Sequence, residues 1–139
     1  MFRGFARGLQ QTGEVEASER ISRYILSKRY FSAANRTVKY AAYLPAPNGE
    51  TSVYRTSSLS EEEIWKIGQE YVAKPSKRTL YARGDTTAAV ILKTGLDVTP
   101  ETTPHPLHAN ILNWPSEKDE KKMFAIEIVN EATLAVCPY

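Results

Sequence analysis

Both histidines of the 139-residue chain lie in one proline-rich segment that reads PHPLHANILNWP. His105 and His108 are three positions apart, and imidazoles titrate near neutral pH, so the pair has the chemistry of a general acid and a general base. A metal pair would need a third ligand from elsewhere in the fold, such as Asp85, Asp97 or Asn110. We expect neither a bound metal nor another cofactor, because two histidines are ordinary for a domain of this size.

The same segment also has a structural interpretation. Proline fixes the backbone, so residues 104–115 suit a rigid surface loop that leads into the last helix. In that arrangement Trp114 packs over the start of the helix, and Asn110 or Asn113 bonds to the backbone.

Two arginines stand where a guanidinium can hold a phosphate. Arg55 is in a Tyr-Arg-Thr series at a predicted strand end, and Arg83 begins an Arg-Gly-Asp turn. The planar fork of a guanidinium matches phosphate or carboxylate, whereas internal ion pairs with nearby aspartates are the alternative. One hypothesis is therefore a metal-independent phosphoester enzyme, similar to a ribonuclease toxin. Its catalytic candidates are His105, His108, Arg55 and Arg83.

The first 45 residues are more basic than the rest of the chain and rich in tyrosine. They hold eight basic and three acidic residues, although the whole chain has a net charge of only +2. Cations hold phosphates and aromatic rings stack on bases, so this half suits a polyanion. The alternative is that the charges are solvated and the tyrosines belong to the core. The candidate binding residues are Arg23, Lys28, Arg29, Tyr30, Arg36, Lys39, Asn110 and Trp114.

The composition is that of one folded domain, with 42% hydrophobic and 24% charged residues. Cys137 is the only cysteine, so no intramolecular disulfide is expected. No apolar run is long enough to span a bilayer, and the first residues lack the apolar stretch of a secretion signal. We therefore expect a cytoplasmic protein without a membrane partner.

The pattern of helix and strand signals predicts an α+β fold. We expect a single compact domain over residues 18–139, in which a small, mainly antiparallel sheet packs against two or three helices. Residues 1–17 have no clear periodicity, so they are predicted to form a flexible N-terminal arm.

The first half of the domain is predicted to begin with a helix and continue with a β-hairpin. Ser18 can cap a helix over residues 19–29. Residues 37–44 and 51–57 are rich in β-branched residues and tyrosine, and the Asn48-Gly49 pair between them suits a tight turn. These two runs are therefore predicted to pair with each other.

The second half begins with a strong local signal. Ser60 and Glu63 have the spacing of a capping box, which predicts a helix that ends at Lys74-Pro75. Residues 87–93 fit a helix or a strand, because periodicity does not decide over so short a span. Further strands are predicted at residues 79–83, 96–99 and 134–137, and a last helix is predicted to start at Pro115-Ser116.

Four motifs are spaced along the chain: Tyr54-Arg55-Thr56, Ile64-Trp65, Arg83-Gly84-Asp85 and His105…His108-Ala109-Asn110-Ile111…Trp114-Pro115. In this series the chain resembles a small uncharacterised family of bacterial proteins over residues 20–133. The resemblance implies a prokaryotic or mobile-element origin and transfers no catalytic role. The Tyr-Arg-Thr-Ser run followed by a helix is also similar to the start of ADP-ribosyl-transferring or RNA 2′-phosphotransferase domains, but the rest of those patterns is missing.

The sequence leaves two hypotheses about function. The first is an accessory binding protein of a bacterial or phage-related system, which contacts nucleic acid or a protein partner through the basic half. The alternative is the phosphoester enzyme described above. The sequence has no phosphate-binding loop, no dinucleotide fingerprint and no nucleophile elbow, which argues against the enzyme classes that depend on these motifs.

Overall fold

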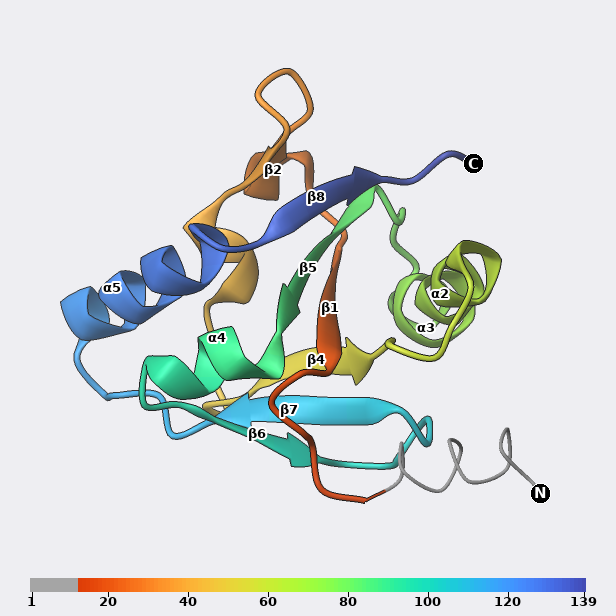
Figure 1. Cartoon of the computed structure of the whole chain (residues 1–139). Coiled ribbons are helices and arrows are strands. Elements are labelled where there is room, and N and C mark those ends of the chain that lie inside the picture. The colour runs from red at the N-terminus through yellow and green to blue at the C-terminus, as the bar shows by residue number, and fades with distance from the viewer. Residues whose placement is uncertain (1–12) are drawn as a thin grey trace.

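A twisted six-stranded sheet organises the chain (Figure 1). The computed structural model describes residues 13–139. The strand order is β6-β7-β4-β1-β5-β8, and every neighbouring pair is antiparallel. The strands are β1 (Arg20–Ile25), β4 (Thr51–Arg55), β5 (Ala82–Thr87), β6 (Asp97–Pro100), β7 (His108–Leu112) and β8 (Thr133–Val136).

Helices cover both faces of the sheet, which confirms the predicted α+β class. Val53 and Tyr54 are neighbours on β4 and so point to opposite faces. Val53 joins a larger core with α4, α5 and η2, whereas Tyr54 joins a smaller core with α2 and η3. The helical elements are α2 (Glu61–Ile67), the π-helical η3 (Gly68–Ala73), α3 (Lys74–Ser76), α4 (Ala88–Lys93), α5 (Lys118–Val129) and the 3₁₀ turn η2 (Tyr40–Tyr43).

A two-stranded ribbon connects β1 to η2. It follows the short turn η1 (Lys28–Tyr30) and pairs β2 (Phe31–Ser32) with β3 (Thr37–Val38). Its loop projects away from the main sheet (Figure 1).

The helix predicted over residues 19–29 is wrong, because this stretch forms the central strand β1 and the turn η1. β1 pairs with β5 over its whole length, and Ile21, Tyr24 and Ile25 are buried. Isoleucine and tyrosine favour strands, and so short a pattern does not separate the helical period from the strand period. Pairing with residues distant in the sequence therefore decides the structure.

The predicted hairpin of residues 37–44 with residues 51–57 is also wrong. β3 pairs with β2, whereas β4 pairs with β1 and β7. The tight turn itself does form, and Gly49 adopts a φ of 84° in it. η2 and the prolines that follow it turn the chain before a ladder with β4 can begin.

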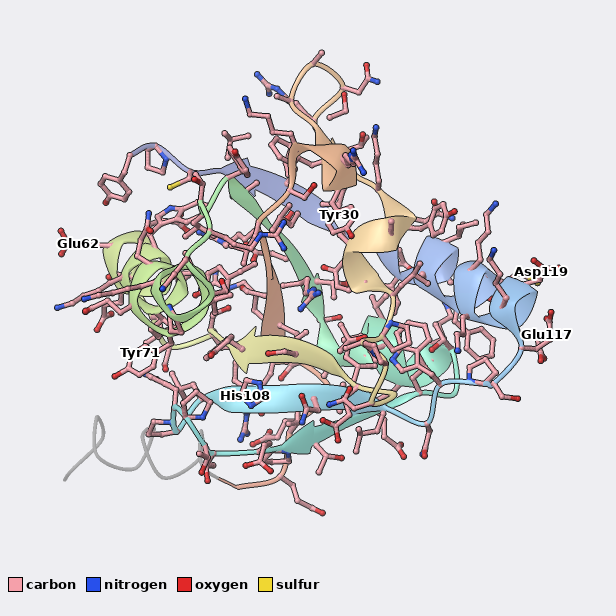
Figure 2. All side chains as sticks on the ribbon, turned by 180° about the vertical axis from the view of Figure 1, so that it is seen from behind. Tyr30, Glu62, Tyr71, His108, Glu117 and Asp119 are labelled. Atoms are coloured by element: carbon pink, nitrogen blue, oxygen red, sulfur yellow. The ribbon has the colours of Figure 1, made fainter. Side chains whose placement is uncertain are left out.

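Two predictions near the last helix need correction. Residues 104–115 are not a loop throughout, because β7 occupies their middle and pairs on both sides, with β4 and β6. The helix α5 begins at Lys118 instead of Ser116, and its N-cap is the carboxylate of Glu117, which accepts from the Glu120 N–H. Figure 2 shows Glu117 and Asp119 at the exposed start of α5, where negative charge suits the free amides.

Local signals predicted most of the other elements. Both hydrogen bonds of the capping box between Ser60 and Glu63 are present, and residues 87–93 are resolved as the helix α4, which Thr87 caps. β6 and β8 lie within one residue of their predicted positions. The strand expected at residues 79–83 begins three residues later as β5 and extends to Thr87, and the helical segment continues through Pro75 to Ser76.

Among residues 13–139, no helix combines the length and apolarity needed to cross a membrane. The expected cytoplasmic location stays a prediction. So does the arm expected over residues 1–17, most of which lies outside the described residues.

At Gly68 the helical segment lies against Tyr24 of β1 and Leu80. A Cβ atom added there would lie 2.6 Å from Cε1 of Tyr24 and 2.8 Å from Cδ2 of Leu80. The Tyr24 ring cannot move away easily, because it is buried and its hydroxyl donates to the carbonyl of Ile64.

We therefore expect Gly68→Ala to lower the free energy of unfolding by about 1–2 kcal/mol. Overpacking costs about 1–3 kcal/mol and outweighs the roughly 0.5–1 kcal/mol that alanine gains in a helix. Urea denaturation measures the change. Gln69→Ala, at the next and exposed position, is the control and should stay within about 0.5 kcal/mol of wild type.

Candidate functional site

The central sheet splits between β1 and β4. These strands pair only at Ile21–Arg55 and Ser22–Tyr54, whereas β1 pairs with β5 over all six of its residues. Arg23 bridges the gap. Its Nε donates to the carbonyl of Ala42 at 2.7 Å, and its Nη1 donates to the carbonyl of Ser52 at 2.9 Å. The Arg23 side chain thus occupies the place where the β1–β4 ladder would otherwise continue.

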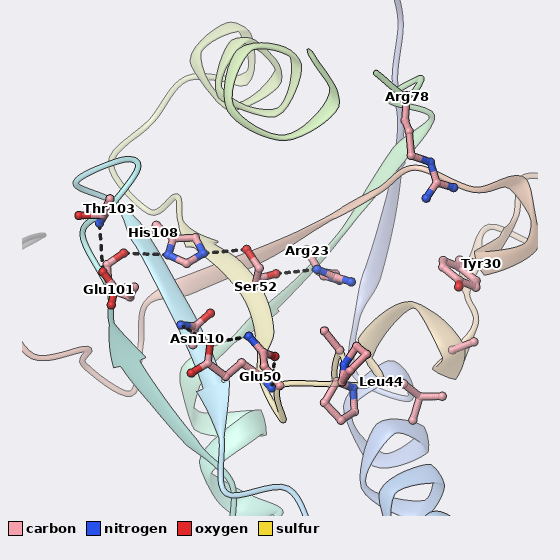
Figure 3. A pocket seen from close by; sticks show the side chains of 15 residues that line it. Arg23, Tyr30, Leu44, Glu50, Ser52, Arg78, Glu101, Thr103, His108 and Asn110 are labelled. Carbon is pink, nitrogen blue, oxygen red and sulfur yellow. Dashed lines mark hydrogen bonds between the residues drawn. The ribbon is translucent and has the colours of Figure 1, made fainter. Parts of the chain in front are cut away.

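A cavity of about 830 Å³ opens at this split (Figure 3). One wall is the apolar turn after η2, formed by residues 44–47. The polar side chains come from separate elements of the fold. They include Arg23 of β1, Tyr30 of η1, Ser52 of β4, Arg78, and His108 and Asn110 of β7.

Ser52 and His108 form a hydrogen-bonded pair in this cavity. β4 and β7 set Ser52 opposite Asn110 and Tyr54 opposite His108, so the four side chains share one face of the sheet. His108 Nε2 lies 2.7 Å from Ser52 Oγ, and His108 Nδ1 lies 2.7 Å from the carbonyl oxygen of Glu101. A carbonyl only accepts, so Nδ1 of the neutral imidazole carries the proton and Nε2 accepts from the Ser52 hydroxyl.

The guanidinium of Arg23 carries an unneutralised charge. Burial lowers the pKa of Arg23, against an opposite effect of the nearby Tyr43 and Tyr30, but an arginine remains charged in a protein. Among residues 13–139, no carboxylate lies within ion-pair distance of it.

Two carboxylates, those of Glu50 and Glu101, line the cavity on the side away from Arg23, and both already accept hydrogen bonds. Glu50 accepts hydrogen bonds from the side-chain amides of Asn110 and Asn48, and Glu101 accepts from the N–H of Thr103. Figure 3 shows these acids at the β7 side and Arg23 at the opposite side, with Ser52 between His108 and Arg23. The charge of the cavity is therefore divided between a cationic end and an anionic end.

The structure places Arg55, one of the catalytic candidates, inside the protein. Its guanidinium is fully buried and pairs with Glu19 at 2.8 Å. The carbonyls of Gly13 and Glu14 accept from its Nη atoms. Arg55 therefore ties the start of the described chain to β4 and does not line the cavity that holds His108.

Arg83, the second arginine candidate, is held in a separate ionic cluster. It bonds to Glu61 at 2.7 Å and to Asp85 at 3.0 Å, and its guanidinium lies 4.7 Å from the ring centroid of Trp65. Hydrogen bonds from Arg83 lower the pKa of the Glu61 carboxyl. Like Arg55, Arg83 does not line the cavity with His108.

His105 lies near His108 but in a different hollow. The ring of Tyr54 stands beside both imidazoles, with centroid distances of 6.0 Å to His105 and 5.2 Å to His108. The hollow of His105 is shared with Tyr71 of η3, whose ring centroid is 4.8 Å away. Figure 2 shows Tyr71 on the helical segment, close to the end of β7 where His108 lies. The structure thus brings the two histidines close but does not place them in one cavity.

The binding candidates divide into three groups. The cavity gathers Arg23, Tyr30 and Asn110. Trp114 packs against the larger core, and its buried Nε1 has no hydrogen-bond partner among residues 13–139. The remaining candidates are exposed and lie around η1 and the ribbon: Lys28, Arg29, Arg36 and Lys39.

Sequence reasoning missed Ser52 and Arg78. A serine in a strand and an arginine after a helix have no distinctive local pattern. Only the register between β4 and β7 would have shown that Ser52 faces His108, because these residues are 56 positions apart.

Among residues 13–139, no group of three or more His, Cys, Asp or Glu side chains is arranged to hold a metal ion. Comparisons of the chain with protein-family models, with curated proteins and with solved structures find no match. The geometry of the cavity is therefore the basis for a functional proposal.

The buried ion pair of Arg55 and Glu19 leads to a prediction about stability. Arg55→Met leaves the carboxylate of Glu19 buried without its cation, so we expect a loss of about 3–5 kcal/mol in the free energy of unfolding. Chemical denaturation measures this loss. Adding Glu19→Gln removes the uncompensated charge and should restore more than half of it. Equal stability of wild type and Arg55→Met would contradict a structural role for the pair.

A second prediction concerns pH and His105. Burial lowers the pKa of His105, with a smaller effect of His108, and His105 Nδ1 accepts from the Leu107 N–H. As the pH falls, His105 therefore becomes protonated at a higher pH in the unfolded chain than in the folded protein. The stabilising contribution of His105 is complete above its unfolded pKa of about 6.5 and is lost as the pH falls through the lower folded value.

His105→Asn keeps an acceptor oxygen near the position of Nδ1 but does not titrate. We expect this variant to lose less stability than wild type between about pH 7 and about pH 5. NMR titration of the His105 ring should give a pKa below the usual histidine range. A pKa at or above that range would contradict the prediction.

Proposed function

We propose that the cavity at the β1–β4 split binds a nucleotide, either free or as part of a single nucleic-acid strand. The observation that carries the proposal is the guanidinium of Arg23, which is half-buried at the cavity and has no carboxylate partner among residues 13–139. A buried charge is costly unless it is paired, so an anionic ligand is the natural partner.

The donors of Arg23 favour a phosphate group. Nε and one N–H of Nη1 are used by backbone carbonyls, which fixes the plane of the guanidinium. The remaining N–H groups are available to the cavity and form the planar fork that suits phosphate oxygens. Arg78 adds a second cation to the lining.

The size and polarity of the cavity favour a nucleotide over inorganic phosphate. A volume of about 830 Å³ is in the usual range for sites that hold small organic ligands. Tyr30 and the apolar turn at residues 44–47 offer surfaces for a flat ring. At the other end, the carboxylate of Glu50 can accept from the amino group of a base, as carboxylates do from cytosine.

This proposal narrows the nucleic-acid contact expected from the basic first half of the chain. Of that half, Arg23 and Tyr30 line the cavity, and the exposed Lys28 and Arg29 belong to the same turn as Tyr30. These cations would attract a phosphate chain to the mouth of the cavity. A strand that continued beyond the bound nucleotide would therefore lie along η1.

The proposal predicts that Arg23→Met weakens binding of adenosine monophosphate by at least about tenfold, because a hydrogen-bonded charge contributes about 1.5–3 kcal/mol. Isothermal titration calorimetry measures the dissociation constant. Adenosine without its phosphate should bind more weakly than the monophosphate, and added salt should weaken binding of the monophosphate. A short single-stranded oligonucleotide, titrated in parallel, distinguishes a free nucleotide from one in a chain.

Lys93→Met is the matched control. It removes one positive charge from the exposed side of α4, outside the lining of this cavity, and should leave the affinity unchanged. Wild type that binds neither the monophosphate nor the oligonucleotide would overturn the proposal. Equal affinities of wild type and Arg23→Met would also overturn it.

A further inference from the structure

We propose that the cavity is also a catalytic site, in which Ser52 is the nucleophile and His108 the general base for cleavage of a phosphodiester. This inference rests on the proposed function, since the substrate is a nucleotide phosphate held by Arg23. It differs from the enzyme hypothesis drawn from the sequence, because it uses neither His105 nor the two paired arginines, Arg55 and Arg83.

The arrangement of Ser52 and His108 is that of an activated nucleophile. A serine hydroxyl needs a base within hydrogen-bond distance and a third group that orients the base. Nε2 of His108 lies 2.7 Å from Ser52 Oγ, and the Glu101 carbonyl holds Nδ1 at 2.7 Å. The base is therefore fixed in the tautomer that can take the proton of Ser52.

The backbone around His108 makes this orientation rigid. The Glu101 N–H donates to the His108 carbonyl at 3.0 Å, so Glu101 is bonded both to the backbone and to the ring of His108. Only 7% of His108 is exposed, and the ring of Tyr54 packs beside the imidazole. A base held in this way needs no rearrangement before the reaction.

Besides a nucleophile and a base, the reaction needs a group that stabilises the charge on the phosphoryl oxygens, and Arg23 would supply it. Its Nη1 donates to the backbone carbonyl of Ser52, so the guanidinium lies next to the residue that carries the attacking oxygen. Figure 3 shows Ser52 between His108 and Arg23, with the base on one side and the cation on the other. A phosphate bound by Arg23 would therefore lie beside Ser52 Oγ.

The reaction would proceed in two balanced steps. In the first, Ser52 Oγ attacks the phosphorus atom, His108 Nε2 takes the hydroxyl proton, the bond from phosphorus to the leaving oxygen breaks, and the imidazolium gives its proton to that oxygen. In the second, a water molecule attacks the phosphorus of the diester that now joins the rest of the substrate to Ser52, and it gives one proton to Nε2. The bond between phosphorus and Oγ then breaks, and the imidazolium of His108 returns the proton to Ser52 Oγ. The products are an alcohol and a phosphomonoester, with no change in oxidation state.

A fluorophosphonate probe tests the nucleophile directly, since an activated serine displaces its fluoride and keeps the phosphorus. We expect mass spectrometry of the labelled wild-type protein to find the adduct on Ser52. Ser52→Ala should not be labelled, and His108→Gln should react at least about 100-fold more slowly, which is the low end of general-base catalysis. Ser116→Ala is the matched serine control and should be labelled as wild type is. Thermal unfolding verifies that each variant is folded.

Hydrolysis of bis(4-nitrophenyl) phosphate tests turnover. Wild type should release 4-nitrophenolate, whereas Ser52→Ala should lose this activity and still bind adenosine monophosphate within about threefold of wild type. Wild type without labelling at Ser52, or Ser52→Ala with undiminished turnover, would overturn the catalytic proposal. If Arg23→Met abolishes nucleotide binding in that case, the binding function stands alone. Labelling at Ser52 without any nucleotide binding would support the activated serine and overturn the substrate class.

Discussion

The Arg23 side chain takes the place of backbone pairing between β1 and β4, and the cavity depends on this substitution. Beyond Ser22, β1 and β4 no longer pair, and the guanidinium of Arg23 satisfies the carbonyl of Ser52 that faces the gap. The same side chain also bonds to η2 through Ala42, so it fixes the position of the turn that forms the apolar wall. A half-buried arginine without a carboxylate partner among residues 13–139 is thus the structural support of the cavity as well as its main cation.

Three buried or half-buried arginines have different chemistry because they have different partners. Arg55 is neutralised by Glu19, and Arg83 is neutralised by Glu61 and Asp85. In both cases the acids compensate a buried guanidinium charge that would be costly alone. Arg23 bonds to neutral carbonyls instead, which satisfy its hydrogen-bond donors but leave its charge. Its lack of a partner acid among residues 13–139, more than its residue type, distinguishes Arg23 from the other two arginines.

Features that depend on neighbouring residues could be predicted from the sequence, and features that depend on pairing could not. The capping box of Ser60 and Glu63 acts within one helical turn, so its residue types were sufficient. β1 has side chains that suit a helix or a strand, and its pairing with β5 decided the outcome. His108 was identified as a candidate by its chemistry, but its partner Ser52 depends on the register of β4 with β7. That register follows from the packing of the whole sheet.

The narrow β1–β4 junction divides the sheet into two groups of three strands, β6-β7-β4 and β1-β5-β8. In sequence, however, these groups alternate: β1, then β4, then β5, then β6 and β7, and finally β8. No single cut of the chain separates them, so neither group is an independent unit that could be exchanged, duplicated or expressed alone. The wall of the cavity that carries Arg23 and the wall that carries Ser52 and His108 therefore cannot be separated without dividing the fold.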